Sequence, residues 1–211
     1  MDLDQHGHSR RKFNSERISM VPDIRKIPAF FSAEECEYLI EMATPLQQPS
    51  VVVHPSTGTF VQDPVRTSTA AAFPFISENP FLHAINQRIA AATGTQYDQG
   101  EPLQVLSYTV GQEYKPHSDA LPGFHNQRVK TMLVYLNEDF EGGATFFTKI
   151  GKAIRGQTGD AILFMNVDMQ GKPDPAAVHA GRPVDKGRKF ILSKWIRQYP
   201  LDLSGPPDRP F

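Results

Sequence analysis

Cysteine is almost absent from this chain, since Cys36 is the single example in 211 residues. One thiol forms no internal disulfide and cannot build a cysteine zinc site, so any bound metal must be held through oxygen and nitrogen. An excess of one charge is missing too, because the formal net charge is -1 and the pI is about 6.7. The chain lacks the basic field that draws proteins to nucleic acid or anionic membranes, and we expect neither partner.

Long apolar runs are also missing, and no window approaches the roughly 20 apolar residues that cross a bilayer. The first ten residues, MDLDQHGHSR, contain no apolar core of a secretory signal. We therefore expect a cytoplasmic protein without a membrane span. A chain of 211 residues is long enough for one substantial core and short for two average domains, so we expect a single domain over 1–211.

An amphipathic helix is predicted in the string SAEECEYLIEMA. Ser32 and Glu35 have the spacing of a capping box, in which each side chain satisfies a free backbone N–H at the helix start. Tyr38, Leu39 and Met42 recur at helical spacing and are expected to share the buried face.

A second helix is predicted in NPFLHAINQRIAAATG. Asn79 is the expected N-cap, Pro80 suits the first helical position, and Gly94 is the expected C-terminal stop. Its apolar residues recur at helical spacing: Leu82, Ile85 and Ile89. The string HPSTGTFVQDPVRTSTAAA between the two helices is rich in turn formers, and indicates irregular structure or a strand followed by a mobile loop.

From about residue 103 the chain changes to short β-rich runs separated by turn residues: QVLSYTV, KTMLVYLN, ATFFTKI, DAILFMN, AAVHAG and KFILSKWIRQY. Such closely spaced runs predict a mainly β fold with a jelly-roll core, that is, a cupin-like double-stranded β-helix. The two helices would buttress the outside of one sheet. We expect helical and loop support over 1–100, the jelly roll over 101–199 and an extended tail over 200–211.

A candidate metal pair lies in YKPHSDA, where His117 and Asp119 are two residues apart and point to one face of an extended strand end. An imidazole, a carboxylate and one more imidazole form the facial triad of non-haem Fe(II) enzymes, which leaves positions open for a cosubstrate and O2. His179 in AAVHAGRPV is the candidate third ligand. An HxD pair alone is weak evidence, because such pairs also arise by chance.

Lys189 strengthens this interpretation because it follows His179 by ten residues on the strand KFILSKWIR. One face of the strand carries Lys189 and Trp195. A lysine facing into a barrel is costly unless it meets an anion. The alternative places Lys189 in solvent, with Phe190 and Leu192 facing the core.

Taken together, these residues resemble the 2-oxoglutarate oxygenases of the prolyl 4-hydroxylase type. The resemblance runs from Gln104 to Arg197 and is carried by these segments: QVLSYTVGQEYKPHSD, RVKTMLVYLN, EGGATFF, GDAILF and VHAGRPVDKGRKFILSKWIR. It implies that His117, Asp119 and His179 bind Fe(II). Lys189 would pair with the C5 carboxylate of 2-oxoglutarate.

Further roles follow from the same resemblance. Tyr108 corresponds to a tyrosine that hydrogen-bonds 2-oxoglutarate, and Thr145 to a threonine of the same pocket. Trp195 matches a tryptophan beside the active site, while Tyr114 and Arg128 fall where the family positions the substrate proline and its backbone. Without the metal triad, Tyr108 and Trp195 would be interpreted as packing in the barrel.

A weaker similarity connects DPVRTSTAA with the Arg-Thr-Ser segment on the family's mobile substrate loop. It implies that residues 56–72 form a lid and that Arg66 contacts substrate. The string ALPGFHNQ between Asp119 and Arg128 is shorter than in relatives, which would alter the mouth of the site more than its chemistry.

The implied activity is that of an Fe(II)- and 2-oxoglutarate-dependent dioxygenase, which consumes O2, releases succinate and CO2, and hydroxylates an unactivated C–H bond. The expected target is C4 of proline in a peptide or protein, with ascorbate as a candidate reductant. One alternative keeps the chemistry but acts on a free amino acid or small metabolite. Another is a non-catalytic β-sandwich module that binds sugar or metal, which would not need an inward lysine.

Overall fold

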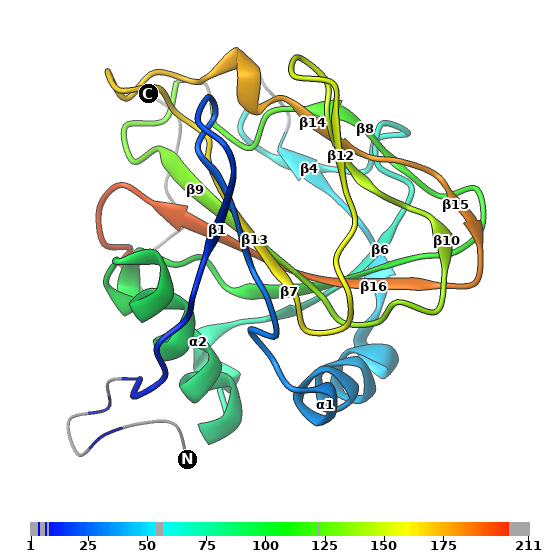
Figure 1. Ribbon diagram of the computed structural model, residues 1–211, viewed down its shortest axis with the longest axis horizontal. Helices are drawn as coiled ribbons and strands as arrows, with labels where there is room; N and C mark the ends of the chain where they lie inside the picture. Colours follow the sequence, from blue (N-terminus) through cyan, green and yellow to red (C-terminus); the bar gives the residue numbers. More distant parts are fainter. Residues whose placement is uncertain (1–3, 5–6, 8, 54–56, 122, 203–211) are drawn as a thin grey trace.

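Two β-sheets face each other at the centre of the fold, and two helices cover the outer side of the larger sheet (Figure 1). The computed structural model describes residues 4, 7, 9–53, 57–121 and 123–202. The predicted tail therefore lies mostly outside the described residues. Two facing sheets with helices on one side agree with the predicted helix-buttressed jelly roll.

The larger sheet has eight strands. Its middle is formed by strands from the second half of the chain, and its edges by strands from the first half. In spatial order the strands are β1 (Glu16–Ser19), β2 (Ile24–Ile27), β13 (Ala161–Met165), β9 (Arg128–Tyr135), β16 (Lys189–Arg197), β7 (Leu103–Tyr108), β6 (Thr69–Phe73) and β3 (Gln48–Pro49).

The smaller sheet has four strands, and two short ribbons extend the structure at its ends. Its strands, in spatial order, are β12 (Lys152–Ile154), β11 (Thr145–Phe147), β14 (His179–Gly181) and β8 (Tyr114–His117). The ribbons pair β10 (Glu141–Gly142) with β15 (Val184–Lys186) and β4 (Val52–Val53) with β5 (Phe60–Val61).

Both predicted helices are present with the predicted caps. α1 spans Ala33–Ala43, and its capping box joins Ser32 to Glu35 in both directions. α2 spans Pro80–Thr93, begins at the Asn79 cap and ends at Gly94, whose left-handed backbone suits glycine. Four short 3-10 turns complete the helical part: Thr44–Leu46, Phe75–Ser77, Tyr97–Gln99 and Pro175–Ala177.

The predicted buried face of α1 is wrong in one respect. Tyr38 is 43% exposed, and its ring packs edge-on against Phe81 of α2. The buried stripe consists instead of Cys36, Leu39 and Ala43. These three residues keep helical spacing, so the predicted amphipathic pattern is correct. The buried face is centred on Leu39, and Tyr38 lies at its edge, where part of its large ring stays exposed.

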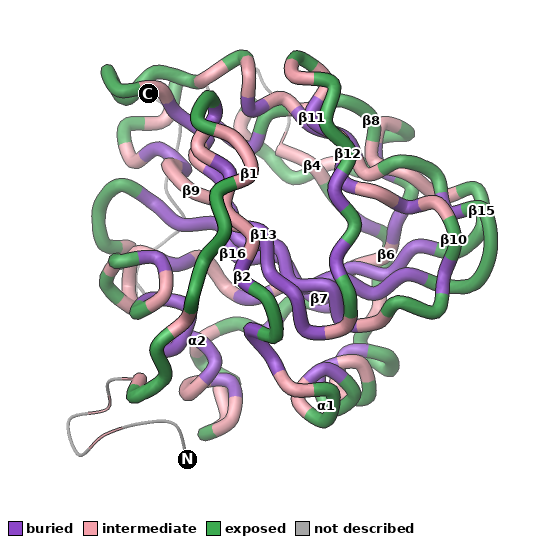
Figure 2. The backbone as a smooth tube through the Cα atoms, in the orientation of Figure 1, coloured by how far each residue is buried: buried purple, intermediate pink, exposed green. Residues whose placement is uncertain are grey.

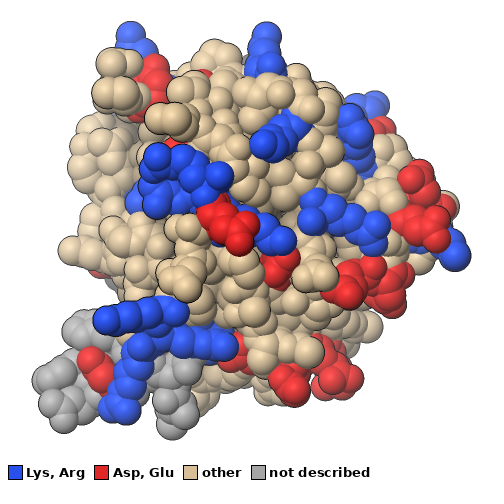
Figure 3. Space-filling model, in the orientation of Figure 1, with Lys and Arg blue, Asp and Glu red and all other residues tan. Residues whose placement is uncertain are grey.

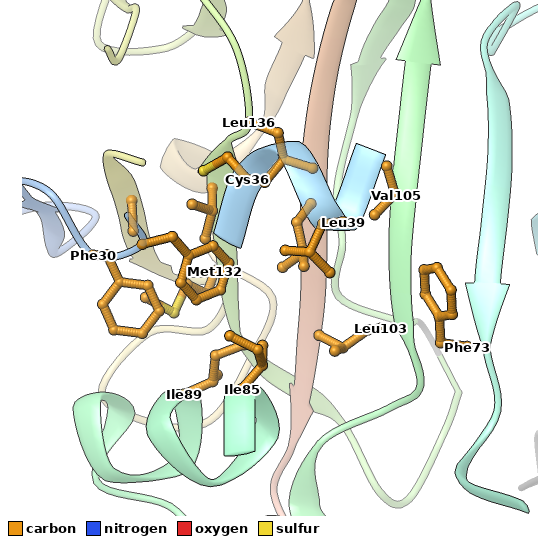
Figure 4. Packing of buried hydrophobic residues seen from close by; sticks show 14 of the residues in the cluster. Phe30, Cys36, Leu39, Phe73, Ile85, Ile89, Leu103, Val105, Met132 and Leu136 are labelled. Atoms are coloured by element: carbon orange, nitrogen blue, oxygen red, sulfur yellow. The ribbon is translucent and has the colours of Figure 1, made fainter. Parts of the chain in front are cut away.

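Two hydrophobic clusters lie on opposite faces of the main sheet. The first fills the space between the sheet and the helices, where Leu39, Ile85 and Ile89 meet strand residues such as Val105 and Met132 (Figure 4). The second lies between the two sheets and includes these aromatic side chains: Tyr108, Tyr135, Phe140, Phe147 and Phe164. Strands β7 and β16 run through the most buried part of the molecule (Figure 2).

The six β runs predicted after residue 103 each contain a strand, but among the first hundred residues a strand was considered only within HPSTGTFVQDPVRTSTAAA, and the β1–β2 hairpin was not predicted. Strand β6 pairs with β7, and the β1–β2 hairpin pairs with β13. In β1 all four residues are at least partly accessible. Such half-exposed edge strands lack the apolar run by which a buried strand is identified.

Charges of both signs are distributed over the face shown in Figure 3, where Lys and Arg are spread across the view and several acidic groups lie at the right and lower right. This mixture agrees with the net charge of -1. None of the helices in the described part of the chain is long and apolar enough to cross a membrane. The cytoplasmic location stays a prediction.

Candidate metal centre and pocket

Three potential metal ligands converge between the two sheets. His117 ends β8 and lies directly opposite His179, the first residue of β14. Asp119 follows in the bend after β8, and ligand atoms from the three side chains all lie within 4.8 Å of one another. The Asp119 Oδ1 is 3.7 Å from His117 Nε2, and its Oδ2 is 3.7 Å from His179 Nε2. The fold thus brings together the residues predicted as a facial triad.

The second ring nitrogen of each histidine is fixed by a backbone carbonyl. His117 Nδ1 lies 2.8 Å from the Lys115 oxygen, and His179 Nδ1 lies 3.0 Å from the Ala177 oxygen. Because a carbonyl oxygen can only accept, each Nδ1 carries the hydrogen and each Nε2 presents its lone pair to the centre. This arrangement is typical of metal-binding histidines, so the donor set fits Fe(II).

The protonation states also suit a cation. Burial, together with the neighbouring His179, lowers the pKa of His117 to about 3, so its imidazole is neutral at physiological pH. Burial alone would raise the pKa of Asp119, but His179, His117, Arg128 and a hydrogen bond from Thr131 outweigh it and keep that pKa below its usual value. Two neutral imidazoles and a carboxylate are the forms that bind a divalent metal.

A pocket opens from these ligands into the space between the sheets. Its cavity volume is about 40 Å³, and Lys189 lies in it with 3% of its surface exposed. The ammonium donates to the Gly143 oxygen at 2.7 Å. Burial, with the charge of Arg155, lowers the pKa of Lys189 to about 7. The solvent-facing alternative for this lysine is wrong, although Phe190 and Leu192 do pack beneath the helices.

Tyr108 and Thr145, predicted to contact 2-oxoglutarate, line the same pocket as Lys189. Tyr108 pairs directly with Lys189 across β7 and β16, and the ammonium lies 5.4 Å from the ring centre. The Thr145 hydroxyl is 3.0 Å from the hydroxyl of Tyr135. Tyr135 is fully buried and was not identified from the sequence. The pocket therefore has a cationic and hydroxyl-bearing end, which suits a dicarboxylate.

Three of the four predicted substrate residues line the pocket: Arg66, Tyr114 and Trp195. The Arg66 guanidinium lies 4.9 Å from the centre of the Tyr114 ring. Its Nη2 and the Trp195 Nε1 are buried without a hydrogen-bond partner among the described residues. Two buried donors without partners are unusual in a folded protein, and here both belong to the pocket wall.

Arg128 is placed differently from the prediction. It does not line the pocket, because its guanidinium is held by two bonds to Glu101 at 2.6 and 2.7 Å. Glu101 also accepts from Arg197 at 2.6 Å. The Arg128 guanidinium lies 4.2 Å from the centre of the Trp195 ring. Arg128 therefore contacts the pocket residue Trp195 without itself lining the pocket. Glu101, which holds Arg128 in place, was not identified from the sequence.

The predicted lid is only partly described, since Ser56 lies outside the described residues. Strand β5 belongs to this region and pairs with β4, and its Phe60 is 65% exposed. Further along, Arg66 forms a backbone bridge with Tyr114, which attaches the end of the segment to the smaller sheet. Closure of the segment stays a prediction.

Comparison with known proteins agrees with this geometry. Residues 103–197 match the family model of the 2OG-Fe(II) oxygenase superfamily. Prolyl 4-hydroxylase 1 of Arabidopsis thaliana is 39% identical over 202 residues, covering 87% of this chain and 71% of that protein. The chain belongs to the prolyl 4-hydroxylase family of 2OG-Fe(II) oxygenases.

Other members of the family show the same relationship. Prolyl 4-hydroxylase 5 of Arabidopsis thaliana is 34% identical over 217 residues, covering 92% of this chain and 74% of that protein. The crystal structure of a viral collagen prolyl hydroxylase from Paramecium bursaria Chlorella virus 1 in complex with 2OG superimposes with a TM-score of 0.65. That structure is 28% identical and covers 83% of this chain and 96% of the viral chain.

Family membership establishes the cofactors as Fe(II), 2-oxoglutarate and O2, and makes the protein a 2-oxoglutarate-dependent oxygenase. The non-catalytic binding module considered from the sequence is therefore wrong. The match also confirms the family and the fold class that the sequence predicted.

Proposed function

We propose that this protein hydroxylates proline residues at C4 within peptide or protein chains. His117, Asp119 and His179 would hold the iron, and Lys189 would bind the distal carboxylate of 2-oxoglutarate. The observation that carries the proposal is the placement of the three ligands and a buried lysine in one pocket. When bound, Fe(II) with 2-oxoglutarate and O2 supplies the oxidising power for C–H hydroxylation, with succinate and CO2 as products.

The chain's own residues orient these groups and exclude water. Lys189 offers a charge-assisted bond to a carboxylate at the closed end of the pocket, where Tyr108 and Thr145 add hydroxyl donors. Nonpolar side chains such as Leu133 and Ile191 also line the pocket. A dry wall of this kind strengthens the electrostatic interactions inside and keeps bulk water from the reacting centre.

A peptide substrate is supported by the two unpartnered donors at the pocket. Arg66 Nη2 and Trp195 Nε1 are N–H groups that a main-chain carbonyl of an extended peptide can satisfy. A proline-rich segment presents unpaired carbonyls, because proline lacks the N–H that would otherwise bond them. The relatives named prolyl 4-hydroxylases support the same choice.

The decisive experiment supplies Fe(II), 2-oxoglutarate and O2 with three kinds of substrate: proline-rich peptides, matched peptides with alanine for proline, and free amino acids. We expect one added oxygen per modified proline and an equal amount of succinate. Asp119→Ala should abolish both products. Turnover of free amino acids, with none on peptides, would contradict the peptide assignment while keeping the chemistry.

The contribution of Arg66 is tested in the same assay. Arg66→Ala should raise the KM for peptide while leaving the affinity for 2-oxoglutarate unchanged. Arg182→Ala is the matched control, since Arg182 lies over the Phe146 ring and does not line the pocket. Unchanged peptide turnover in Arg66→Ala would contradict both the contact and the lid.

We further propose ascorbate as the reductant that restores activity after unproductive cycles. Its omission should shorten the linear phase of succinate formation without changing the initial rate. A linear phase of the same length without ascorbate would contradict this role.

A further inference from the structure

A chain of two buried hydrogen bonds ends on the carboxylate of Asp119. The Asn166 amide donates from Nδ2 to Thr131 Oγ1 at 2.9 Å, and Thr131 Oγ1 donates to Asp119 Oδ2 at 2.7 Å. Asn166 and Thr131 are 1% and 0% exposed, so bulk water does not compete for these bonds. Neither residue lines the pocket.

The direction of the second bond follows from the number of hydrogens. A threonine hydroxyl has one hydrogen and two lone pairs, whereas an ionised carboxylate can only accept. Because Asn166 Nδ2 already occupies a lone pair on Oγ1, the hydroxyl hydrogen is free to point at Asp119. The opposite orientation of the amide would present its oxygen to Thr131 and compete with Asp119 for that hydrogen.

The orientation of the Asn166 side-chain amide leaves one of its atoms without a hydrogen bond. Its Oδ1 is buried without a hydrogen-bond partner among the described residues. An unsatisfied buried carbonyl is unfavourable, and the other orientation could give it a partner only by taking the Thr131 hydrogen. The unsatisfied oxygen is therefore the consequence of keeping the amide as a donor.

The backbone fixes both members of the chain. Thr131 lies in the middle of the main sheet, where β9 pairs it with Phe164 on one side and Trp195 on the other. Asn166 directly follows β13, where its N–H donates to the Val129 oxygen and its own carbonyl accepts from Asp174. The two side chains thus have little freedom to move away from Asp119.

We propose that Thr131, oriented by Asn166, is a positioning residue that sets the Asp119 carboxylate for metal binding. The inference rests on the proposed role of Asp119 as an iron ligand. The Thr131 bond occupies Oδ2, whereas Oδ1 accepts no hydrogen bond within the described part of the chain. The carboxylate is thereby held in one rotamer, with Oδ1 left as the freer oxygen.

The test measures the affinity of the full-length, metal-free protein for Mn(II), which replaces Fe(II) without undergoing oxidation. Thr131→Val removes the hydroxyl and keeps the shape, and we expect it to weaken Mn(II) binding about ten- to hundredfold. Thr131→Ser keeps the hydroxyl and should restore most of the affinity. Thr93→Val is the matched control, because Thr93 is buried in α2 and its hydroxyl forms hydrogen bonds only with backbone carbonyls of its helix and with the Thr95 hydroxyl.

Coupling between the two residues provides a second measurement. Asn166→Ala should weaken Mn(II) binding less than Thr131→Val, because the hydroxyl remains but is no longer oriented. The double variant should bind Mn(II) as weakly as Thr131→Val alone, because Asn166 acts through Thr131. Additive losses in the double variant would overturn the proposal.

An unchanged affinity in Thr131→Val, or a Thr131→Ser affinity no better than that of Thr131→Val, would also overturn it. If Thr131→Val does not fold, as judged by its unfolding transition, an unchanged affinity in Asn166→Ala overturns it instead. Asp119→Ala separates this failure from that of the proposed function. Loss of Mn(II) binding there with normal binding in the Thr131 variants would refute the positioning role alone, whereas normal binding in Asp119→Ala would refute the iron site.

Discussion

Tyr114 stacks on His117, with ring centroids 3.4 Å apart and planes inclined by 11°. The ring of His179 also lies close to that of His117, with ring centres 4.4 Å apart. The Arg66 guanidinium lies 4.9 Å from the centre of the Tyr114 ring. A proposed metal ligand therefore contacts two rings, and one of them also contacts an arginine proposed to bind substrate.

The stack predicts that Tyr114→Ala weakens Mn(II) binding severalfold, because the His117 imidazole loses the ring that limits its rotation. Tyr114→Phe should keep the affinity of the unmodified protein, since stacking requires the ring and not the hydroxyl. Calorimetric titration of the metal-free variants with Mn(II) checks both. Equal affinities in the alanine and phenylalanine variants would show that the stack does not orient the imidazole.

Binding of 2-oxoglutarate is expected to take up a proton above about pH 7. Burial holds the pKa of Lys189 at about 7 in the free pocket, so the lysine loses its charge as the pH rises through that value. A bound carboxylate favours the charged form and raises this pKa, so affinity should fall by up to about tenfold per pH unit above pH 7. Calorimetry at pH 8.5 in buffers of different ionisation enthalpy measures the uptake.

Lys189→Arg is the matched variant for this experiment, because a guanidinium keeps its charge throughout this range. It should bind 2-oxoglutarate without proton uptake by this residue and with a flatter dependence on pH. Equal proton uptake in both proteins at pH 8.5 would assign the effect to another group.

A second buried lysine predicts a dependence of stability on pH. Lys194 donates to Asn86 Oδ1 at 2.7 Å, and burial lowers its pKa to about 7 although Glu78 and Glu101 oppose the shift. The unfolded chain, with a lysine pKa of about 10.4, binds more protons than the fold between these values. The contribution of Lys194 to the unfolding free energy should therefore rise with pH above 7, by at most about 1.4 kcal/mol per pH unit.

Urea unfolding of Lys194→Met and of the unmodified protein, at several pH values from 6.5 to 9.5, measures this contribution. The unfolding free energy of the unmodified protein minus that of Lys194→Met should increase as the pH rises. A difference that stays constant over this range would mean that Lys194 keeps an ordinary pKa in the fold.

Glu101→Gln is predicted to destabilise the protein by about 3–5 kcal/mol, because it removes the carboxylate charge to which two buried guanidinium groups, Arg128 and Arg197, donate. Chemical unfolding measures the loss. Trp195 is the only tryptophan of the chain, so its fluorescence should also change as Arg128 loses its anchor. Glu141→Gln, in an exposed pair with Lys186, is the control and should cost less than about 1 kcal/mol. A similar small cost for both variants would contradict the prediction.

The parts of the fold that are encoded locally could be predicted. The Ser32–Glu35 capping box and the Asn79 and Gly94 ends of α2 depend on residues a few positions apart. The strand runs after residue 103 were also visible, because their residues are buried in the middle of the sheet. The edge strand β1 was not visible, because partial exposure removes its apolar pattern.

The candidate site could also be predicted only in part. His117 and Asp119 are close in sequence, His179 and Lys189 were identified in strand-like segments further along the chain, and the resemblance added the roles of all four residues. Nothing near Thr131 in the sequence indicates its bond to Asp119, because that contact depends on how β9 is placed relative to the bend after β8.

Arg128 is a residue whose predicted contact differs from the one in the structure. Its position in the resemblance indicated substrate, whereas the folded chain pairs it with Glu101, 27 residues earlier. Which of several buried groups an arginine meets depends on the register of strands that are distant in sequence.

All nine residues of β16 are buried, with Lys189 and Trp195 on the pocket side and Leu192 and Ile196 beneath the helices. Strand β16 therefore separates the pocket from the hydrophobic core beneath the helices and contributes side chains to both. During evolution or laboratory selection, α1 and α2 therefore cannot be repacked independently of catalysis. Screens for altered specificity should find productive changes at pocket residues such as Arg66 sooner than beneath this strand.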